Sequence, residues 1–90
     1  MSLPVNKKFE LRRQVHHLKP VVMLGQHGLT PAVNAEIDQA LTAHELIKIR
    51  ISGQEREDKK AVTEEICKTH NAELIQAVGH IIAIYRARPK

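Results

Sequence analysis

Apolar residues at helical spacing predict three helices. In each candidate, apolar side chains recur every three or four positions, so they gather on one face while charged side chains occupy the other. The helices are expected from Pro4 to about His17, from Pro31 to His44 and from about Glu57 to His70. Thr30 should cap the second helix, and Asn71 should close the third in a left-handed conformation.

Two apolar runs with a different pattern predict strands. In Leu46–Ile51, isoleucines alternate with Lys48 and Arg50, so one face should be buried and the other basic or partly covered. The run Val21–Leu24 predicts a buried strand, because its core is β-branched and Pro20 precedes it.

The order of the elements predicts an α/β fold. Two further runs, Ala72–Val78 and Ile81–Arg86, flank Gly79-His80 and indicate a hairpin. Strands separated by helices favour right-handed crossovers onto one sheet. We therefore expect a four-stranded mixed sheet packed with three helices, in the order α-β-α-β-α-β-β, as one domain over residues 1–90.

Composition narrows the protein class. The aromatic residues are only Phe9 and Tyr85, so the core should be aliphatic. The one cysteine, Cys67, excludes an internal disulfide and suits a reducing compartment. No apolar run approaches the roughly 18 residues of a membrane span, so we expect a cytoplasmic protein with no membrane partner.

Charge is distributed unevenly along the chain. Residues 1–30 carry five basic side chains and one acid, residues 31–78 carry six and nine, and residues 79–90 carry three and none. Basic ends around a slightly acidic middle suggest one positive face if the two ends meet in the fold. Such a face favours a polyanionic partner, although charge alone is a modest indication.

A glycine loop lies between the first expected strand and the second helix. Gly25-Gln26-His27-Gly28 leads directly to the capped helix, so backbone N–H groups and the positive end of the helix dipole should face one exposed spot, as in phosphate sites. The G-x-x-G pattern is weak alone and also fits an ordinary turn. KH domains use such a loop to hold a nucleotide backbone. The spacing does not match a nucleotide-triphosphate loop.

Other side chains give little support for catalysis or metal binding. Cys67 and His70 could face each other on a helix, but no oxyanion site accompanies them, so a packing cysteine is expected rather than a nucleophile. Among the six histidines, no pair has zinc-protease spacing. Four are expected at the surface or at helix ends: His16, His17, His44 and His70. His27 and His80 lie in loops beside glycines and are better candidates for RNA contact. We expect no enzyme activity, cofactor or metal.

Four segments together resemble one known family. Leu18–Val22, Leu24–Thr30, Glu45–Ile49 and Gly79–Arg86 are similar to the CRM domain, which is named for chloroplast RNA splicing and ribosome maturation and has stand-alone bacterial members of the YhbY type. The resemblance covers almost the whole chain in order. It implies an RNA-binding fold related to the C-terminal domain of translation initiation factor three, and association with precursors of the large ribosomal subunit. Where the family usually has lysine after the hairpin glycine, this chain has His80.

The resemblance places the family's G-x-x-G loop on Gly25–Gly28 and its basic last strand on Gly79–Arg86. We therefore expect a monomeric protein that binds the RNA backbone, with ribosomal RNA of a large-subunit precursor as its partner, and that assists ribosome assembly. The expected contacts are Gly25, Gln26, His27, Gly28, Lys8, Arg12, Lys19, His80 and Arg86. The basic side chains should lie on the same side of the domain as the loop and form a continuous track.

Two considerations limit this expectation. The scarcity of aromatic residues argues against a base-stacking platform, so recognition should rest on backbone and shape. The alternative is a protein-interaction adaptor without direct RNA contact, in which the apolar and acidic middle docks a partner and the basic ends are incidental.

Overall fold

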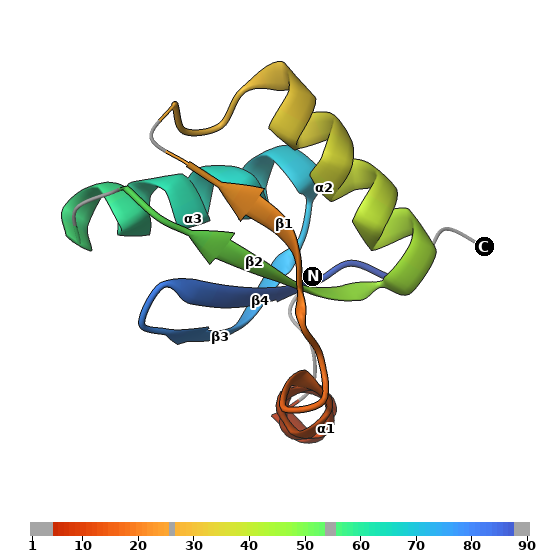
Figure 1. The fold of residues 1–90 in the computed structure, drawn as a ribbon. Helices are drawn as coiled ribbons and strands as arrows, with labels where there is room; N and C mark the ends of the chain where they lie inside the picture. The colour runs from red at the N-terminus through yellow and green to blue at the C-terminus, as the bar shows by residue number, and fades with distance from the viewer. Residues whose placement is uncertain (1–4, 26, 54–55, 88–90) are drawn as a thin grey trace.

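The computed structural model describes residues 5–25, 27–53 and 56–87 (Figure 1). The elements, in chain order, are α1 (Val5–Val15), β1 (Pro20–Leu24), α2 (Pro31–His44), β2 (Leu46–Ile51), α3 (Arg56–His70), β3 (Glu73–Val78) and β4 (Ile81–Tyr85). This order confirms the predicted one. Pro4, the expected start of the first helix, lies outside the described residues.

The strands form one mixed sheet in the order β1-β2-β4-β3. β1 runs parallel to β2, and Leu24 pairs with Ile51 where both strands end. β4 runs antiparallel to β2 and β3, and its first residue, Ile81, pairs with Arg50 and Val78. The β3–β4 turn therefore lies beside the ends of β1 and β2. We call this end of the sheet the loop end, and it carries residues 25, 27–30, 52–53 and 79–80.

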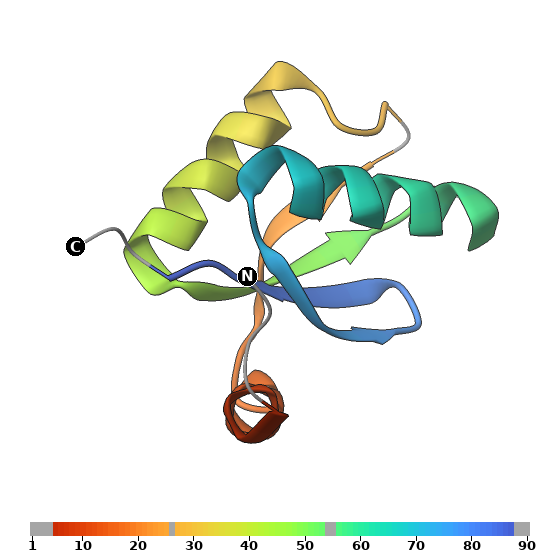
Figure 2. The same cartoon turned by 180° about the vertical axis from the view of Figure 1, so that it is seen from behind.

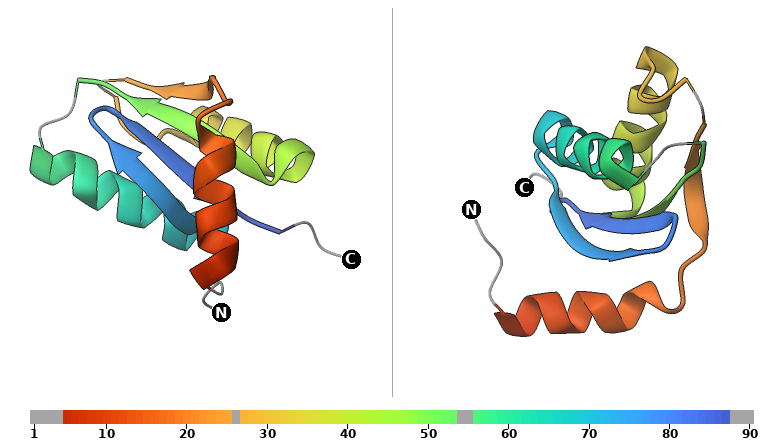
Figure 3. Two further views of the ribbon diagram at one scale, coloured as in Figure 1. Left: turned by 90° about the horizontal axis from the view of Figure 1, so that it is seen from below. Right: turned by 90° about the vertical axis from the view of Figure 1, so that its left-hand side faces the viewer.

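Helices cover the two faces of the sheet unequally. α2 and α3 lie side by side on one face (Figures 1 and 2). α1 lies alone on the other face, where Leu11 and Val15 pack on a smaller cluster containing Leu46, Ile75 and Ala83 (Figure 3). The main core, under α2 and α3, consists of Val22, Leu24, Ile37, Leu41, Ile47, Ile49, Ile51, Ile66, Ile82 and Ile84. Figure 3 shows that α1 crosses the sheet away from the loop end, which leaves that part of the face without a described helix.

Local chemistry fixes the helix ends as predicted. The hydroxyl of Thr30 accepts a hydrogen bond from the N–H of Val33 at 3.2 Å, and Pro31 occupies the first helical position, where its missing N–H is no loss. Asn71 has the left-handed φ of 53° that ends α3.

One expectation about burial was wrong. β1 is not a buried strand but an edge strand, paired on one side only with β2. Val22 and Leu24 point into the main core, whereas Val21 and Met23 point to the opposite face and are 52% and 65% exposed. An apolar run alone does not distinguish these cases, because burial of its second face depends on what the rest of the chain places there.

Candidate nucleic-acid interface

Three segments meet at the loop end: the loop between β1 and α2, the end of β2, and the β3–β4 turn. The N–H of Ile51 donates to the carbonyl of His80 at 2.7 Å, and the N–H of Ser52 donates to the carbonyl of Leu24 at 2.9 Å. Neighbouring strands lie about 4.8 Å apart, so Gly25 and His80 are separated by two strand spacings, about 10 Å. The hydrogen bonds therefore place His80 at the same end of the sheet as the glycine loop, and Figure 1 shows the β3–β4 turn at the end of the sheet where β1 leads into this loop.

Some of the backbone donors of the loop are used within the loop itself, and others are left without a protein acceptor. The N–H of Gly28 donates to the carbonyl of Gly25 at 3.0 Å and closes the turn, so this amide is not available to a ligand. Among the described residues, the N–H groups of His27, Leu29 and Ala32 have no protein acceptor. These three donors belong to the loop just before α2 and to its first turn, where the helix dipole favours an anion.

The two loop glycines differ in what the fold requires. Gly28 has φ of 70°, the left-handed region that side chains disfavour. Gly25 does not have a positive φ, and a Cβ placed on it would meet nothing within 4 Å. Its lack of a side chain leaves room for an external group to approach the backbone. Gln26, also expected in the site, lies outside the described residues.

Lys59 of α3 contacts the loop end, which the sequence analysis did not predict. From the first turns of α3, its ammonium donates to the carbonyl of Gly79 at 2.9 Å and lies 3.4 Å from Nδ1 of His80. The carboxylates of Glu57 and Asp58 are exposed on the same turns. One feature of the sequence could have drawn attention to Lys59: it is a lysine near the start of a helix, where the helix dipole favours acidic side chains.

Three of the expected basic contacts lie elsewhere. Lys8 and Arg12 belong to α1, on the opposite sheet face from α2. Nζ of Lys8 lies 3.8 Å from the carboxylate of Glu73, and Nε of Arg12 donates to the carbonyl of Ile75 at 3.2 Å. Lys19 is exposed just before β1, at the other end of that strand from the loop. The structure therefore does not bring these residues together with the loop, and their contact with RNA stays a prediction.

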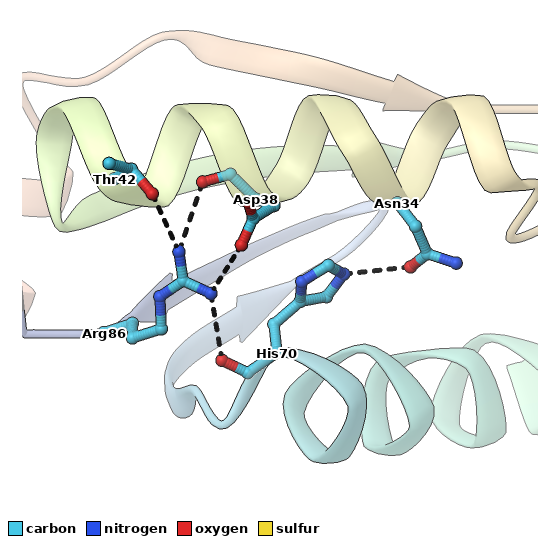
Figure 4. A network of polar contacts seen from close by, with 5 residues as sticks. All are labelled: Asn34, Asp38, Thr42, His70 and Arg86. Carbon is cyan, nitrogen blue, oxygen red and sulfur yellow. Dashed lines mark hydrogen bonds and ion pairs between the residues drawn. The ribbon is translucent and has the colours of Figure 1, made fainter.

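Arg86 lies at the opposite end of the sheet from the loop. It follows β4, whose last residue pairs with the first residue of β2. Its guanidinium lies 3.0 Å from the carboxylate of Asp38 and donates to the Asp38 carbonyl at 3.2 Å, the Thr42 hydroxyl at 3.1 Å and the His70 carbonyl at 3.3 Å (Figure 4). Its side chain is only 21% exposed. These contacts tie the end of β4 to α2 and α3.

His70 stands at a helix end, as expected, but it is buried rather than on the surface. It is 7% exposed, and its Nε2 donates to Oδ1 of Asn34 at 2.9 Å (Figure 4). Burial lowers the pKa of His70, the nearby Arg86 lowers it further, and Asp38 opposes the shift. The lowered pKa favours the neutral form of this imidazole between α2 and α3.

Cys67 has the environment of a packing residue. It is half-buried against the main core, and burial together with the charge of Glu73 raises the pKa of its thiol. A raised pKa keeps the thiol protonated, which is unfavourable for a nucleophile. In residues 5–25, 27–53 and 56–87, no three His, Cys, Asp or Glu side chains are grouped as metal ligands would be. Within the same ranges, none of the helices has the length and apolarity needed to cross a bilayer.

Comparison with known proteins gives a consistent result. The family model of the CRS1/YhbY (CRM) domain matches residues 3–86. A "probable RNA-binding protein" of Pseudomonas aeruginosa is 39% identical over 90 residues, covering 100% of this chain and 86% of that protein. An RNA-binding protein of Haemophilus influenzae is 45% identical over 85 residues, covering 94% of this chain and 86% of that protein.

The fold is also similar to a solved structure. The solution structure of a hypothetical protein from Staphylococcus aureus, described as a candidate RNA-binding protein, superimposes with a TM-score of 0.84 at 30% identity. The match covers 99% of this chain and 93% of that chain.

Proposed function

This chain belongs to the CRS1/YhbY (CRM) domain family, and we propose that it binds RNA at the loop end, without catalysis. The observation that carries the proposal is the set of three N–H donors of His27, Leu29 and Ala32 at the start of α2, close in the chain to Gly25, where a Cβ would meet nothing within 4 Å. Such donors and the helix dipole suit a phosphate of the RNA backbone. The names of the relatives support the same ligand class.

Side chains around the loop would extend this contact. Lys59 and His80 lie on the far side of the end of β2 from the loop and can meet a second phosphate. Lys8 and Arg12 contact β3, whereas Lys19 precedes β1 at the opposite edge of the sheet. Only an RNA large enough to pass around the sheet would reach them together with the loop. We leave Arg86 out of the proposed interface, because its donors are engaged within the protein.

The RNA that we propose is ribosomal RNA in a precursor of the large subunit. A domain that holds the backbone and has only two aromatic residues suits structured RNA, where shape and phosphates are recognised more than bases. The role would be to assist assembly of the subunit, as a monomer in the cytoplasm.

Acidic substitution in the loop tests the site. His27→Asp should weaken binding of a fluorescently labelled transcript of large-subunit ribosomal RNA at least roughly tenfold, about 1.4 kcal/mol, because a carboxylate would face the phosphate. The matched control is Gln39→Asp, which adds the same charge at an exposed position in the middle of α2. Both variants should melt close to the wild-type temperature, since exposed substitutions usually change stability by about 0.5 kcal/mol or less. Equal affinity of the two variants would exclude the loop.

Sedimentation tests the proposed target. In sucrose gradients of cell extract, the wild-type protein should migrate with precursors of the large subunit, and crosslinked RNA should map to its ribosomal RNA. His27→Asp should move the protein to the top of the gradient. Wild-type protein that sediments free of ribosomal particles would contradict the proposed target. It would not contradict RNA binding, which the titration with the labelled transcript tests separately.

A further inference from the structure

The sheet face that α1 leaves uncovered carries a row of side chains across all four strands. Arg50 pairs with Met23 of β1 on one side and with Ile81 of β4 on the other, and Ile81 pairs with Val78 of β3. Residues that face each other on paired strands point to the same side of the sheet. We define the open face as this row and the two neighbours behind it: Val21, Met23, Lys48, Arg50, Val78 and Ile81.

Several aliphatic side chains of the open face are exposed rather than packed in the core. Met23 is 65% exposed, Val78 62% and Val21 52%. Single exposed apolar residues are ordinary, but here Met23 at one edge of the sheet, with Val21 behind it, and Val78 at the other edge belong to one row that Arg50 and Ile81 join, and exposed apolar groups gathered on one face mark interaction sites. Methionine and arginine, adjacent here as Met23 and Arg50, are both enriched at protein interfaces.

The charge of the open face is positive. Its two ionisable side chains are Lys48 and Arg50, and none of its six residues is acidic. Nζ of Lys48 donates to the carbonyl of Leu18 at 3.0 Å and is partly buried. The guanidinium of Arg50 is exposed and makes no hydrogen bond or ion pair with any described residue. A partner with carboxylates next to apolar side chains would complement both properties.

Two other occupants fit the open face less well. Unpaired bases stack on aromatic side chains, but Phe9 lies on α1 and Tyr85 lies at the end of β4 away from the loop end. A second copy of this chain would bring two positively charged faces together, which is unfavourable in a dry interface.

The dimensions favour a short segment over a folded partner. The row spans three strand spacings, about 15 Å, whereas two folded proteins commonly bury about 800 Å² each. Between α1 and the row there is a hollow of about 270 Å³, bordered by Val15, Lys48 and Val78 among others. This volume is below that of most small-molecule sites, about 300–1,000 Å³, and suits an inserted apolar side chain.

We propose that the open face docks a short segment of another protein that carries acidic side chains beside apolar ones. The protein would then contact RNA at the loop end and a protein partner on the opposite side of the sheet from α2 and α3. The proposal does not depend on RNA binding, because its residues are separate from the loop.

A display library of random twelve-residue peptides, selected on the immobilised chain, provides the probe. The enriched peptides should combine Asp or Glu with aliphatic or aromatic residues. Synthetic copies should bind Arg50→Glu at least tenfold more weakly than wild type, and a Met23→Thr, Val78→Thr double variant should lose a similar factor. Arg50→Gln is a milder change and should reduce peptide affinity by a smaller factor. It replaces Arg50→Glu in the test if the glutamate variant fails to fold. Threonine keeps strand propensity while removing apolar surface.

The matched control is Leu74→Thr. Leu74 is also an exposed aliphatic residue of the sheet, but it pairs with Ile84 in a different row, so peptide affinity should be unchanged. His27→Asp should also leave it unchanged. Several results would overturn the proposal: no enrichment, enriched peptides without acids, or peptides that bind the open-face variants normally. Loss of RNA affinity in these variants would assign the face to RNA, and a dimer abolished by Arg50→Glu would assign it to a second copy.

Discussion

At the level of single residues, the two loop glycines separate folding from binding. Gly28→Ala should cost about 1–2 kcal/mol, because the side chain would be held at a left-handed φ of 70°. Gly25→Ala meets no such strain and no neighbouring atom within 4 Å. We expect Gly25→Ala to unfold in urea like the wild type but to bind RNA several-fold more weakly, because its methyl group stands where a phosphate would approach. Unaltered RNA affinity of Gly25→Ala would count against the loop as a close backbone contact.

His70 should make stability depend on pH. Burial, reinforced by Arg86, lowers its pKa in the folded protein, whereas the unfolded chain has a histidine of ordinary pKa, about 6.5. The unfolded state therefore binds the proton more readily. The stabilisation is fully present above about pH 6.5 and is lost as the pH falls through that value towards the lower folded pKa. The free energy of unfolding, measured in urea at pH 7.5 and 5.5, should fall in the wild type and fall less in His70→Gln.

Comparing the wild type with His70→Gln separates the effect of His70 on stability from the effects of the other titrating groups. Glutamine can still donate to Asn34 but does not ionise in this range. If His70→Gln loses as much stability between the two pH values as the wild type, another group is responsible.

At the level of elements, the sequence predicted what depends on local patterns. Helical spacing, strand alternation, the Thr30 cap and the left-handed Asn71 were all found where expected. The order of the elements and the family were also confirmed. Each of these features depends on neighbours within about a turn or a strand, or on motifs that can be compared directly.

The features that the sequence did not predict depend on residues far apart in the chain. The exposure of Met23 depends on which strands flank β1 and where α1 crosses the sheet. The burial of His70 is compensated by a hydrogen bond to Asn34, 36 positions earlier. Arg86 reaches Asp38 across 48 positions. Basic residues near both chain ends suggested one face, but the antiparallel β4 carries Arg86 away from the loop end.

Arg86 was expected to contact RNA, but its hydrogen bonds connect the end of β4 to α2 and α3. It has acceptors on α2 and at the end of α3. Hydrogen bonds to charged groups contribute about 1.5–3 kcal/mol each. The ion pair with Asp38 adds less, because the Asp38 side chain is 61% exposed and water screens the attraction. We expect Arg86→Gln to lower the free energy of unfolding by roughly 1.5–3 kcal/mol and to leave RNA affinity within twofold. Reduced RNA affinity with unchanged stability would return Arg86 to the interface.

At the level of the whole molecule, the basic side chains are spread over several regions. Lys59 reaches the loop end, Lys8 and Arg12 contact β3 from α1, and the open face has Lys48 and Arg50. The net charge of +4 therefore describes no single surface. Which regions touch RNA determines how many phosphates are neutralised, and this number can be measured.

The salt dependence of RNA binding should report that number. For duplex nucleic acid, log K falls with log salt concentration at a slope of about −0.9 per neutralised phosphate. Contacts by the loop amides release few counterions, so binding at the loop end alone, with Lys59 as the cationic side chain, predicts a shallow slope of roughly −1. Participation of α1 would steepen it, and then Lys8→Gln and Arg12→Gln should each make the slope shallower by about 1. Arg50→Gln should leave the slope unchanged, because we assign that residue to a protein partner. Titrations between roughly 50 and 200 mM salt would distinguish a compact loop-end site from an RNA that passes around the sheet. A slope altered by Arg50→Gln alone would contradict both the RNA site at the loop end and the protein site on the open face.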